Sequence, residues 1–115
     1  GEQWMDWQVH SLNVAFTPIF HGLVRQAPEE RDPEHIEKSR AATQHHLAML
    51  DRHLQRSRFV AGDHVSVADI PVGIYAYRWY AFEGIKREPL PALERWYAEL
   101  QTRAPYRAHV MVGLA

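Results

Sequence analysis

The chain has 115 residues, enough for one domain with one core, and a formal net charge of −1. This balance of charge gives no electrostatic case for binding nucleic acid or an anionic membrane, and no apolar run reaches membrane-spanning length. Cysteine is absent, which excludes disulfides, thiolate metal sites and a cysteine nucleophile on this chain, and is compatible with the cytoplasm.

Apolar residues recur at helical spacing from about residue 2 to residue 25 and predict a first helix, which Pro18 should kink or split. A polar connection follows. Asp32-Pro33 then supplies an N-cap and a proline at the first helical position, and the second predicted helix runs from Pro33 to about Gln55. Its inward stripe consists of Ile36, Thr43, Leu47, Leu50 and Leu54.

The third predicted helix has the most distinctive start. Ser66-Val67-Ala68-Asp69 has the spacing of a capping box, in which the Ser66 hydroxyl accepts from the Asp69 N–H and the Asp69 carboxylate accepts from the Ser66 N–H. From Val67 to about Phe82 nearly every residue is apolar or aromatic, which predicts a helix buried among others. Gly73 should let a neighbouring helix approach it closely.

Two further predicted helices each begin at a proline. One starts at Pro91, and a short last one runs from Pro105 to about Met111. Only Arg58-Phe59-Val60 competes for strand. The sequence therefore predicts an all-α fold, a bundle of about five to six helices around a central buried helix, in a single domain over residues 1–115.

The sequence contains few patterns typical of catalysis or metal binding. Eight histidines invite a metal site, but none lies in the His-Glu-x-x-His pattern of a zinc-binding helix. His64, Ser66 and Asp69 are the residue types of a catalytic triad, but capping explains Ser66 and Asp69 better and no nucleophile elbow surrounds them. From the residues alone we expect no metal site, no catalytic residue, and a helical domain that is part of something larger.

Four segments, taken in order, resemble the C-terminal helical domain of bacterial cytosolic glutathione transferases, and together they cover essentially the whole chain. Trp4-Met5-Asp6-Trp7 with residues 12–20 is similar to its first helix. Residues 59–63 and 66–70 resemble its loop and capping box, in which Ser66 and Asp69 are structural. Residues 89–97 resemble its Pro-x-(Leu/Ile)-x-x-Trp signature, and residues 103–107 resemble its closing segment.

The resemblance implies different roles for two domains of the complete enzyme. In the family a thioredoxin-like domain, absent from this sequence, binds most of the glutathione and supplies the residue that activates its sulfur. The isolated chain is therefore expected not to be catalytic. Joined to that domain, it would shape the pocket for a small electrophilic substrate and form much of the interface of a cytoplasmic homodimer that serves detoxification. Glutathione would be a co-substrate, and no cofactor is expected.

The resemblance also implies substrate-binding residues. Asn13 aligns with a first-helix position where some beta-class members place a histidine near the glutathione sulfur; asparagine keeps the hydrogen bond but cannot transfer a proton. Trp79 aligns with a tryptophan that lines the electrophile pocket in some classes. His10 and Phe16 lie within one turn of Asn13, on roughly the same face, and are further candidates. For all four the alternative is a role in the core.

Two other functions stay open. The same helical fold serves as a non-catalytic protein–protein interaction module in elongation-factor and synthetase-associated proteins. A basic surface would favour that role, and the balanced charge argues mildly against it. The chain could also be a stand-alone helical protein with a ligand of its own.

Overall fold

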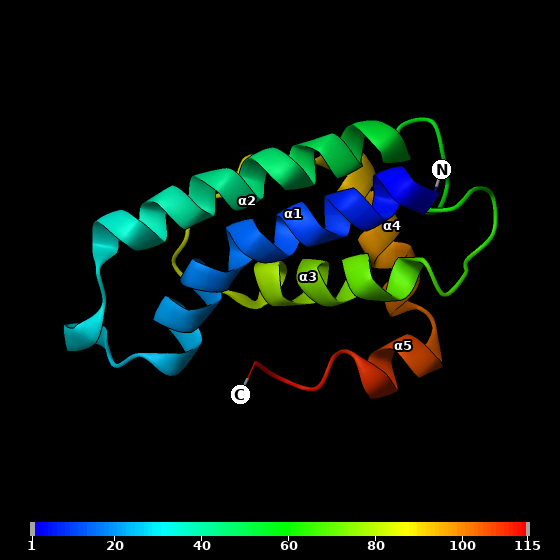
Figure 1. Cartoon of the computed structure of the whole chain (residues 1–115). Helices are drawn as coiled ribbons and strands as arrows, with labels where there is room; N and C mark the ends of the chain where they lie inside the picture. Colours follow the sequence, from blue (N-terminus) through cyan, green and yellow to red (C-terminus); the bar gives the residue numbers. More distant parts are fainter. Residues whose placement is uncertain (1, 115) are drawn as a thin grey trace. The chain divides into compact units, whose positions relative to one another are not determined.

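The computed structural model describes residues 2–114, the side chain of Glu2 excepted, and this part of the chain is built from helices (Figure 1). The predicted all-α class is confirmed: residues 2–114 contain no strand, and Phe59 and Gly62 form only an isolated bridge. No helix in this range combines the length and apolar character needed to cross a bilayer. In chain order the elements are α1 (Glu2–Phe20), η1 (His21–Arg25), η2 (Pro28–Glu30), α2 (Pro33–Leu54), α3 (Asp69–Ala81), α4 (Pro91–Gln101) and α5 (Ala104–His109).

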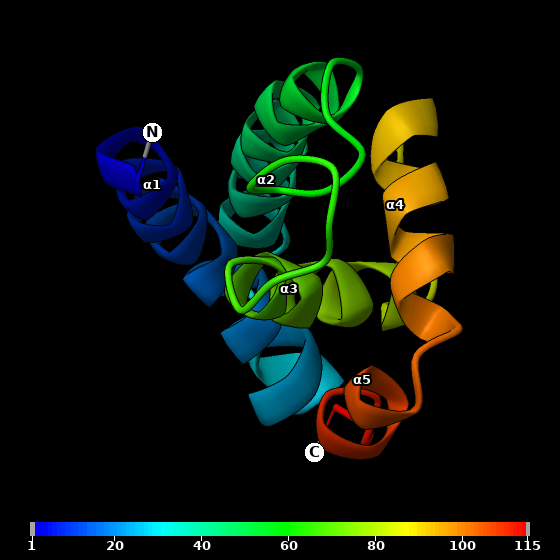
Figure 2. The same ribbon diagram turned by 90° about the vertical axis from the view of Figure 1, so that its right-hand side faces the viewer.

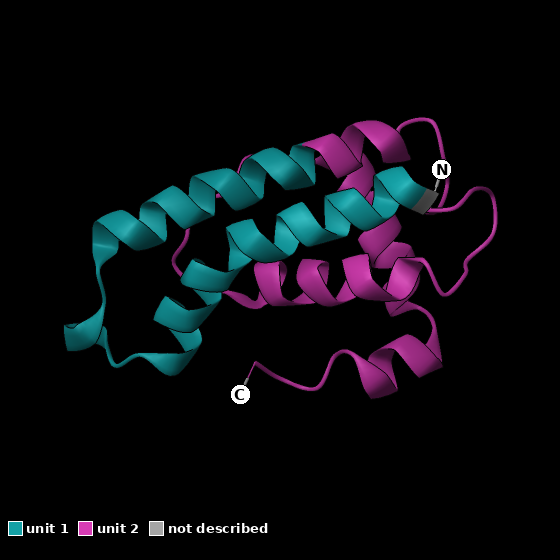
Figure 3. Cartoon of the chain, in the orientation of Figure 1, with its two compact units in different colours: residues 1–48 teal, residues 49–115 magenta. Residues whose placement is uncertain are grey.

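The chain divides into two compact units, and the boundary falls inside α2 (Figure 3). The first unit, Gly1–Ala48, contains α1, the short π-helix η1, the 3-10 turn η2 and most of α2. The second unit, Met49–Ala115, contains the end of α2 together with α3, α4 and α5.

In the first unit a side chain of α2 bridges a gap in the backbone hydrogen bonds of α1. Pro18 lies inside α1, next to a place where the Ser39 hydroxyl of α2 enters the helical hydrogen-bond ladder. Ser39 Oγ donates to the Ala15 carbonyl at 2.5 Å and accepts from the Ile19 N–H at 2.9 Å, and these two groups pair directly in a regular α-helix. The disturbance predicted at Pro18 is therefore present: one backbone hydrogen bond of the helix is replaced by two hydrogen bonds to the Ser39 hydroxyl.

The α-helical part of the first helix ends at Phe20, five residues earlier than expected. The chain continues as the π-helix η1, in which the Gln26 N–H donates to the His21 carbonyl at 3.1 Å. Arg31 holds this wider turn, because its guanidinium donates to the carbonyls of Gly22 and Leu23 at 2.7 and 3.1 Å. The spacing of apolar residues did not reveal this change of helix type.

The expected N-cap of α2 is confirmed. One carboxylate oxygen of Asp32, Oδ1, accepts from the backbone N–H groups of Glu34 and His35, each at 3.2 Å. Of the predicted inward stripe, Thr43, Leu47, Leu50 and Leu54 are buried, and Ile36 is half-buried. The helix ends one residue before the predicted Gln55.

In the second unit α3 begins at Asp69, two residues later than predicted, because residues 67 and 68 form a turn. Half of the capping box is as expected: Asp69 Oδ2 accepts from the Ser66 N–H at 2.8 Å. The other half differs, since the Ser66 hydroxyl accepts from the Ala68 N–H at 3.2 Å, whereas the Asp69 N–H donates to the Ser66 carbonyl at 3.1 Å. Ser66 and Asp69 still organise the start of the helix.

The buried side of α3 is a stripe of five residues: Asp69, Val72, Gly73, Ala76 and Trp79. The remaining positions are half-buried or exposed, so the expectation of burial on nearly every face is too strong. Pro71 lies in the first turn of α3, where a backbone N–H would have no partner within the helix, so the proline removes no helical hydrogen bond.

Gly73 admits a close neighbour, as predicted. Tyr106 of α5 donates its hydroxyl hydrogen to the Gly73 carbonyl at 2.6 Å. A Cβ atom at position 73 would lie 2.8 Å from a ring carbon of Tyr106, so only glycine fits beneath this ring.

A residue of α2 caps α4. Asp51 is buried, and its Oδ1 accepts from the N–H of Leu93 in the first turn of α4 at 2.9 Å. Glu94 adds a local contact, because its carboxylate accepts from the Leu90 N–H at 2.8 Å. In Figures 1 and 2, α4 crosses α3 instead of running alongside it. The Trp96 indole of α4 donates to Asp69 Oδ1 at 2.9 Å and so ties α4 to the start of α3.

Candidate functional site

The outer face of α1 is a stripe of exposed residues that mixes aromatic, apolar and hydrogen-bonding side chains. The exposed positions follow spacings of three and four along the helix: Trp7, His10, Val14, Thr17 and His21 at the start of η1. Trp7 is 55% exposed and Val14 is 61% exposed. Large apolar side chains left open in this way are typical of a surface that contacts a ligand or a partner.

Two of the predicted site residues lie on this side of α1. His10 and Asn13 are both exposed, and Asn13 is adjacent to the stripe. The Asn13 backbone carbonyl accepts from the Thr17 hydroxyl at 2.7 Å. The imidazole of His10 and the carboxamide of Asn13 can each donate and accept hydrogen bonds. This face can therefore orient a polar ligand beside an apolar surface.

The other two predicted residues are buried. Phe16 is 2% exposed, and its ring centroid lies 5.8 Å from that of Phe20. It does not share the exposed face of His10 and Asn13, so that part of the prediction is wrong: Phe16 belongs with Leu12 and Ile19 on the buried side of the helix. Trp79 in the second unit is 1% exposed, and its backbone carbonyl accepts from Arg87 at 2.6 and 3.2 Å.

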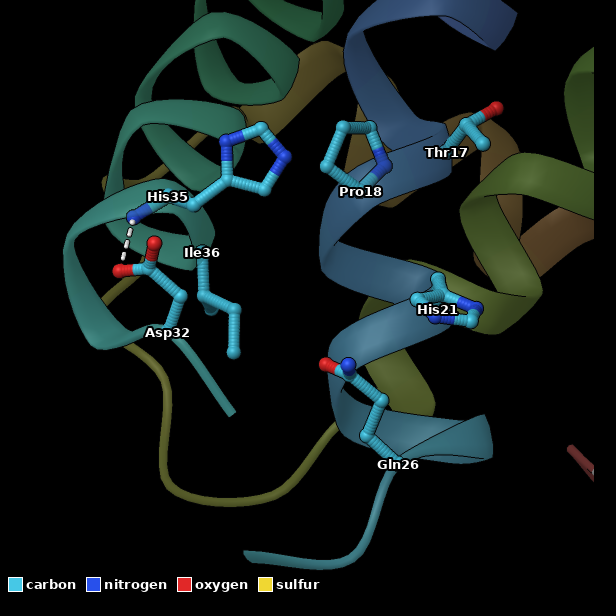
Figure 4. A pocket seen from close by; sticks show the side chains of 7 residues that line it. All are labelled: Thr17, Pro18, His21, Gln26, Asp32, His35 and Ile36. Atoms are coloured by element: carbon cyan, nitrogen blue, oxygen red, sulfur yellow. Dashed lines mark hydrogen bonds between the residues drawn. The ribbon is translucent and has the colours of Figure 1, made fainter. Parts of the chain in front are cut away.

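A cavity of about 300 Å³ lies in the first unit, where α1 passes into η1 and α2 begins. Figure 4 shows Pro18 and Gln26 on one side and His35 and Ile36 on the other, pointing toward one another across the gap. Thr17, His21 and Asp32 complete the lining. Because Thr17 and His21 also belong to the exposed stripe, the cavity continues the outer face of α1.

The cavity wall combines a fixed apolar surface with polar rims. Ile36 lies directly against Gly22, where a Cβ atom would come within 2.6 Å of its side chain. The wall offers two imidazoles and a carboxamide, and Asp32 already uses one oxygen to cap α2. Within residues 2–114 no three histidine, aspartate or glutamate side chains gather closely enough to hold a metal ion. The arrangement suits binding and orientation of an organic ligand.

Sequence reasoning found His10 and Asn13 but missed the rest of this surface. The signal was available, since Trp7, His10, Val14, Thr17 and His21 follow one helical face. These residues did not stand out because apolar residues with helical spacing were all assigned to the core. The cavity itself had no local signal, because its lining comes from two separate segments, residues 17–26 and residues 32–36, which only the fold brings together.

The chain is similar to known proteins over its whole length. The sequence profile described as "Glutathione S-transferase, C-terminal domain" matches residues 33–99. Over all 115 residues the chain is 37% identical to the glutathione S-transferase GstB of Escherichia coli K12, of which it spans 55%. It is also 27% identical, over 101 residues, to the disulfide-bond oxidoreductase YfcG of the same organism, matching 88% of this chain and 46% of YfcG.

The solved structures agree. The chain superimposes with a TM-score of 0.92 on the theta class glutathione S-transferase of Xanthomonas axonopodis pv. citri, whose crystal structure has glutathione bound. The two sequences are 34% identical, and the match covers all of this chain and 60% of that one. The chain thus spans between 46% and 60% of the length of these relatives.

Proposed function

Because the chain belongs to the family of glutathione S-transferase C-terminal domains, we propose that it is the helical half of an enzyme that joins glutathione to a small electrophile. The observation that carries the proposal is the match of the entire chain to a glutathione S-transferase at 37% identity. On this proposal a thioredoxin-like half supplies the activated thiol, and this chain alone has no catalytic activity.

In the proposed enzyme the outer face of α1 positions the electrophile. Trp7 and Val14 offer exposed apolar surface, and His10 and Asn13 offer hydrogen bonds beside it. Holding the electrophile next to a thiolate converts a bimolecular encounter into an oriented reaction, which is the main contribution that such a surface can make. Trp79 is proposed to shape the pocket from α3, and the protein is proposed to act as a cytoplasmic homodimer.

The test uses the protein expressed from its complete reading frame. We expect it to conjugate glutathione to an aryl halide, while the 115-residue chain alone shows no turnover. The variants Asn13→Ala and His10→Ala should raise the KM for the electrophile, with the exposed Lys38→Ala as a control. Absence of glutathione-dependent conjugation by the complete protein would contradict the proposal. Sedimentation of the complete protein tests the dimer separately.

The likeness to YfcG supports a second candidate, reduction of disulfide bonds by the complete protein. The two activities differ in product: conjugation gives a thioether, whereas disulfide reduction releases a free thiol. Assaying both reactions on one preparation decides between them. A complete protein that does neither but binds a partner protein would favour the non-catalytic interaction module.

A further inference from the structure

The charges of three arginine side chains of the second unit act on one carboxylate, that of Glu99. Glu99 of α4 accepts two hydrogen bonds from the guanidinium of Arg58, one of them from Nε at 3.0 Å. Against the opposing effect of desolvation, the pKa of Glu99 is lowered first by this hydrogen bond and then by the charges of Arg58, Arg103 and Arg95. All three positive charges therefore act on the same carboxylate. Positive charge remains in excess even when Asp63, whose charge acts on Arg58, is included.

Arg103 differs from the other two, because its guanidinium has no hydrogen bond or ion pair within the described part of the chain. Its Nε is nevertheless buried. Its Cζ lies 5.5 Å from the centroid of the Phe59 ring, and Arg58 Cζ lies 5.3 Å from the same centroid. Phe59 is 1% exposed, so each guanidinium packs against a buried ring. A buried donor on a cation calls for an acceptor that carries negative charge.

Arg95 has a structural role that accounts for its position. Its guanidinium donates to the carbonyls of Leu54 and Ser57, at 3.0 and 3.4 Å, where α2 ends. Of the three arginines, Arg103 and the exposed part of Arg58 are therefore the ones whose N–H groups can still donate to a ligand.

We propose that Arg58 and Arg103, which both pack against the Phe59 ring, form a binding site for a phosphate group carried by a small molecule. The planar guanidinium forks match the oxygens of a phosphate, and two cations suit its double charge. The Glu99 carboxylate already accepts hydrogen bonds from the Arg58 guanidinium, so it competes with the phosphate for the same donors.

The test is a titration of the protein with inorganic phosphate, followed by NMR of the arginine Nε–H groups at constant ionic strength. We expect saturable shifts at Arg58 and Arg103. Arg103→Gln should weaken binding at least about tenfold, and Arg103→Lys, which keeps the charge without the fork, should weaken it less. Glu99→Gln should tighten binding, because it removes the competing anion. A role of these arginines in folding alone would not produce that gain.

A matched control is available in the first unit, where Arg40 forms an ion pair with Glu37 at 2.6 Å. Arg40→Gln should leave the phosphate titration unchanged. Phenyl phosphate as a second probe identifies the source of the group: tighter binding than inorganic phosphate indicates an organic ester, and equal binding indicates free phosphate. The proposal is overturned if the shifts do not saturate, if chloride reproduces them, or if folded Arg103→Gln, checked by circular dichroism, binds phosphate as well as the parent chain.

Discussion

The Asp69 carboxylate accepts hydrogen bonds from three parts of the second unit and is fully buried. Its donors are the backbone N–H groups of Val60 and Ser66 and the indole of Trp96, at 2.8–2.9 Å. Asp69→Ala should therefore cost about 4 kcal/mol, taking ~1–2 kcal/mol for each donor left unpaired. A urea titration measures it, with the exposed Asp63→Ala as control. A loss near 1 kcal/mol would mean that Asp69 contributes no more stability than an ordinary helix cap.

Thr43 presents the opposite situation. It is fully buried, as its place in the predicted stripe requires, but its hydroxyl has no hydrogen-bond partner among residues 2–114. Thr43→Val removes an unpaired polar group at nearly constant volume, so it should raise the free energy of unfolding by about 1 kcal/mol. The exposed Thr102→Val, which loses a 2.7 Å hydrogen bond to Glu99, should give no gain. Destabilisation by Thr43→Val would mean that the hydroxyl holds a bound water.

His46 should make stability depend on pH. Burial, and then the neighbouring His45, lower the pKa of His46 in the folded chain. The unfolded chain then binds the proton more readily, so the free energy of unfolding should fall as pH drops below about 6.5, the ordinary value for histidine. His46→Gln should lose part of this decline in the urea midpoint between pH 7.5 and 5. Parallel profiles for the two proteins would show that His46 does not contribute.

At the scale of the helix, the effect of replacing Ser39 on the free energy of unfolding should depend on whether Pro18 is present. Ser39→Ala removes the bridge between Ala15 and Ile19 and should cost about 1–3 kcal/mol, because two backbone groups lose a partner at a buried site. With Pro18→Ala, α1 can close that hydrogen bond itself, so the same Ser39→Ala change should cost less. A double-mutant cycle by urea unfolding measures the difference. Additive effects would show that the bridge is unrelated to the proline.

Helix ends were predictable where the capping residue is a near neighbour in sequence. Asp32 for α2 and the Ser66–Asp69 pair for α3 are recognisable because the cap and its donors lie within three positions. The cap of α4 is not, since Asp51 precedes Leu93 by 42 positions, and Ser39 reaches α1 across 20. Such partners are set by tertiary structure, which local patterns do not contain.

At the scale of the whole molecule, the helical fold followed from the sequence pattern and the family followed from the resemblance. Which side of each helix is exposed and which is buried did not follow from either. Helical periodicity places Asn13 and Phe16 near each other, and the boundary between exposed and buried sides runs between them. Burial of Trp79 is what a core role predicts, so resemblance alone is a weak basis for assigning it to a pocket.

The two fully buried tryptophans of the second unit give a controlled test of that assignment in the complete protein. Trp79→Phe should change the ratio of kcat/KM for a bulky and a small electrophile by up to about tenfold, with the KM for glutathione unchanged, because a smaller ring reshapes an apolar pocket. Trp96→Phe loses the indole donor to Asp69, so it should lower the urea midpoint and leave the ratio as it was. If the two variants alter selectivity alike, or if Trp79→Phe alters only stability, Trp79 belongs to the core.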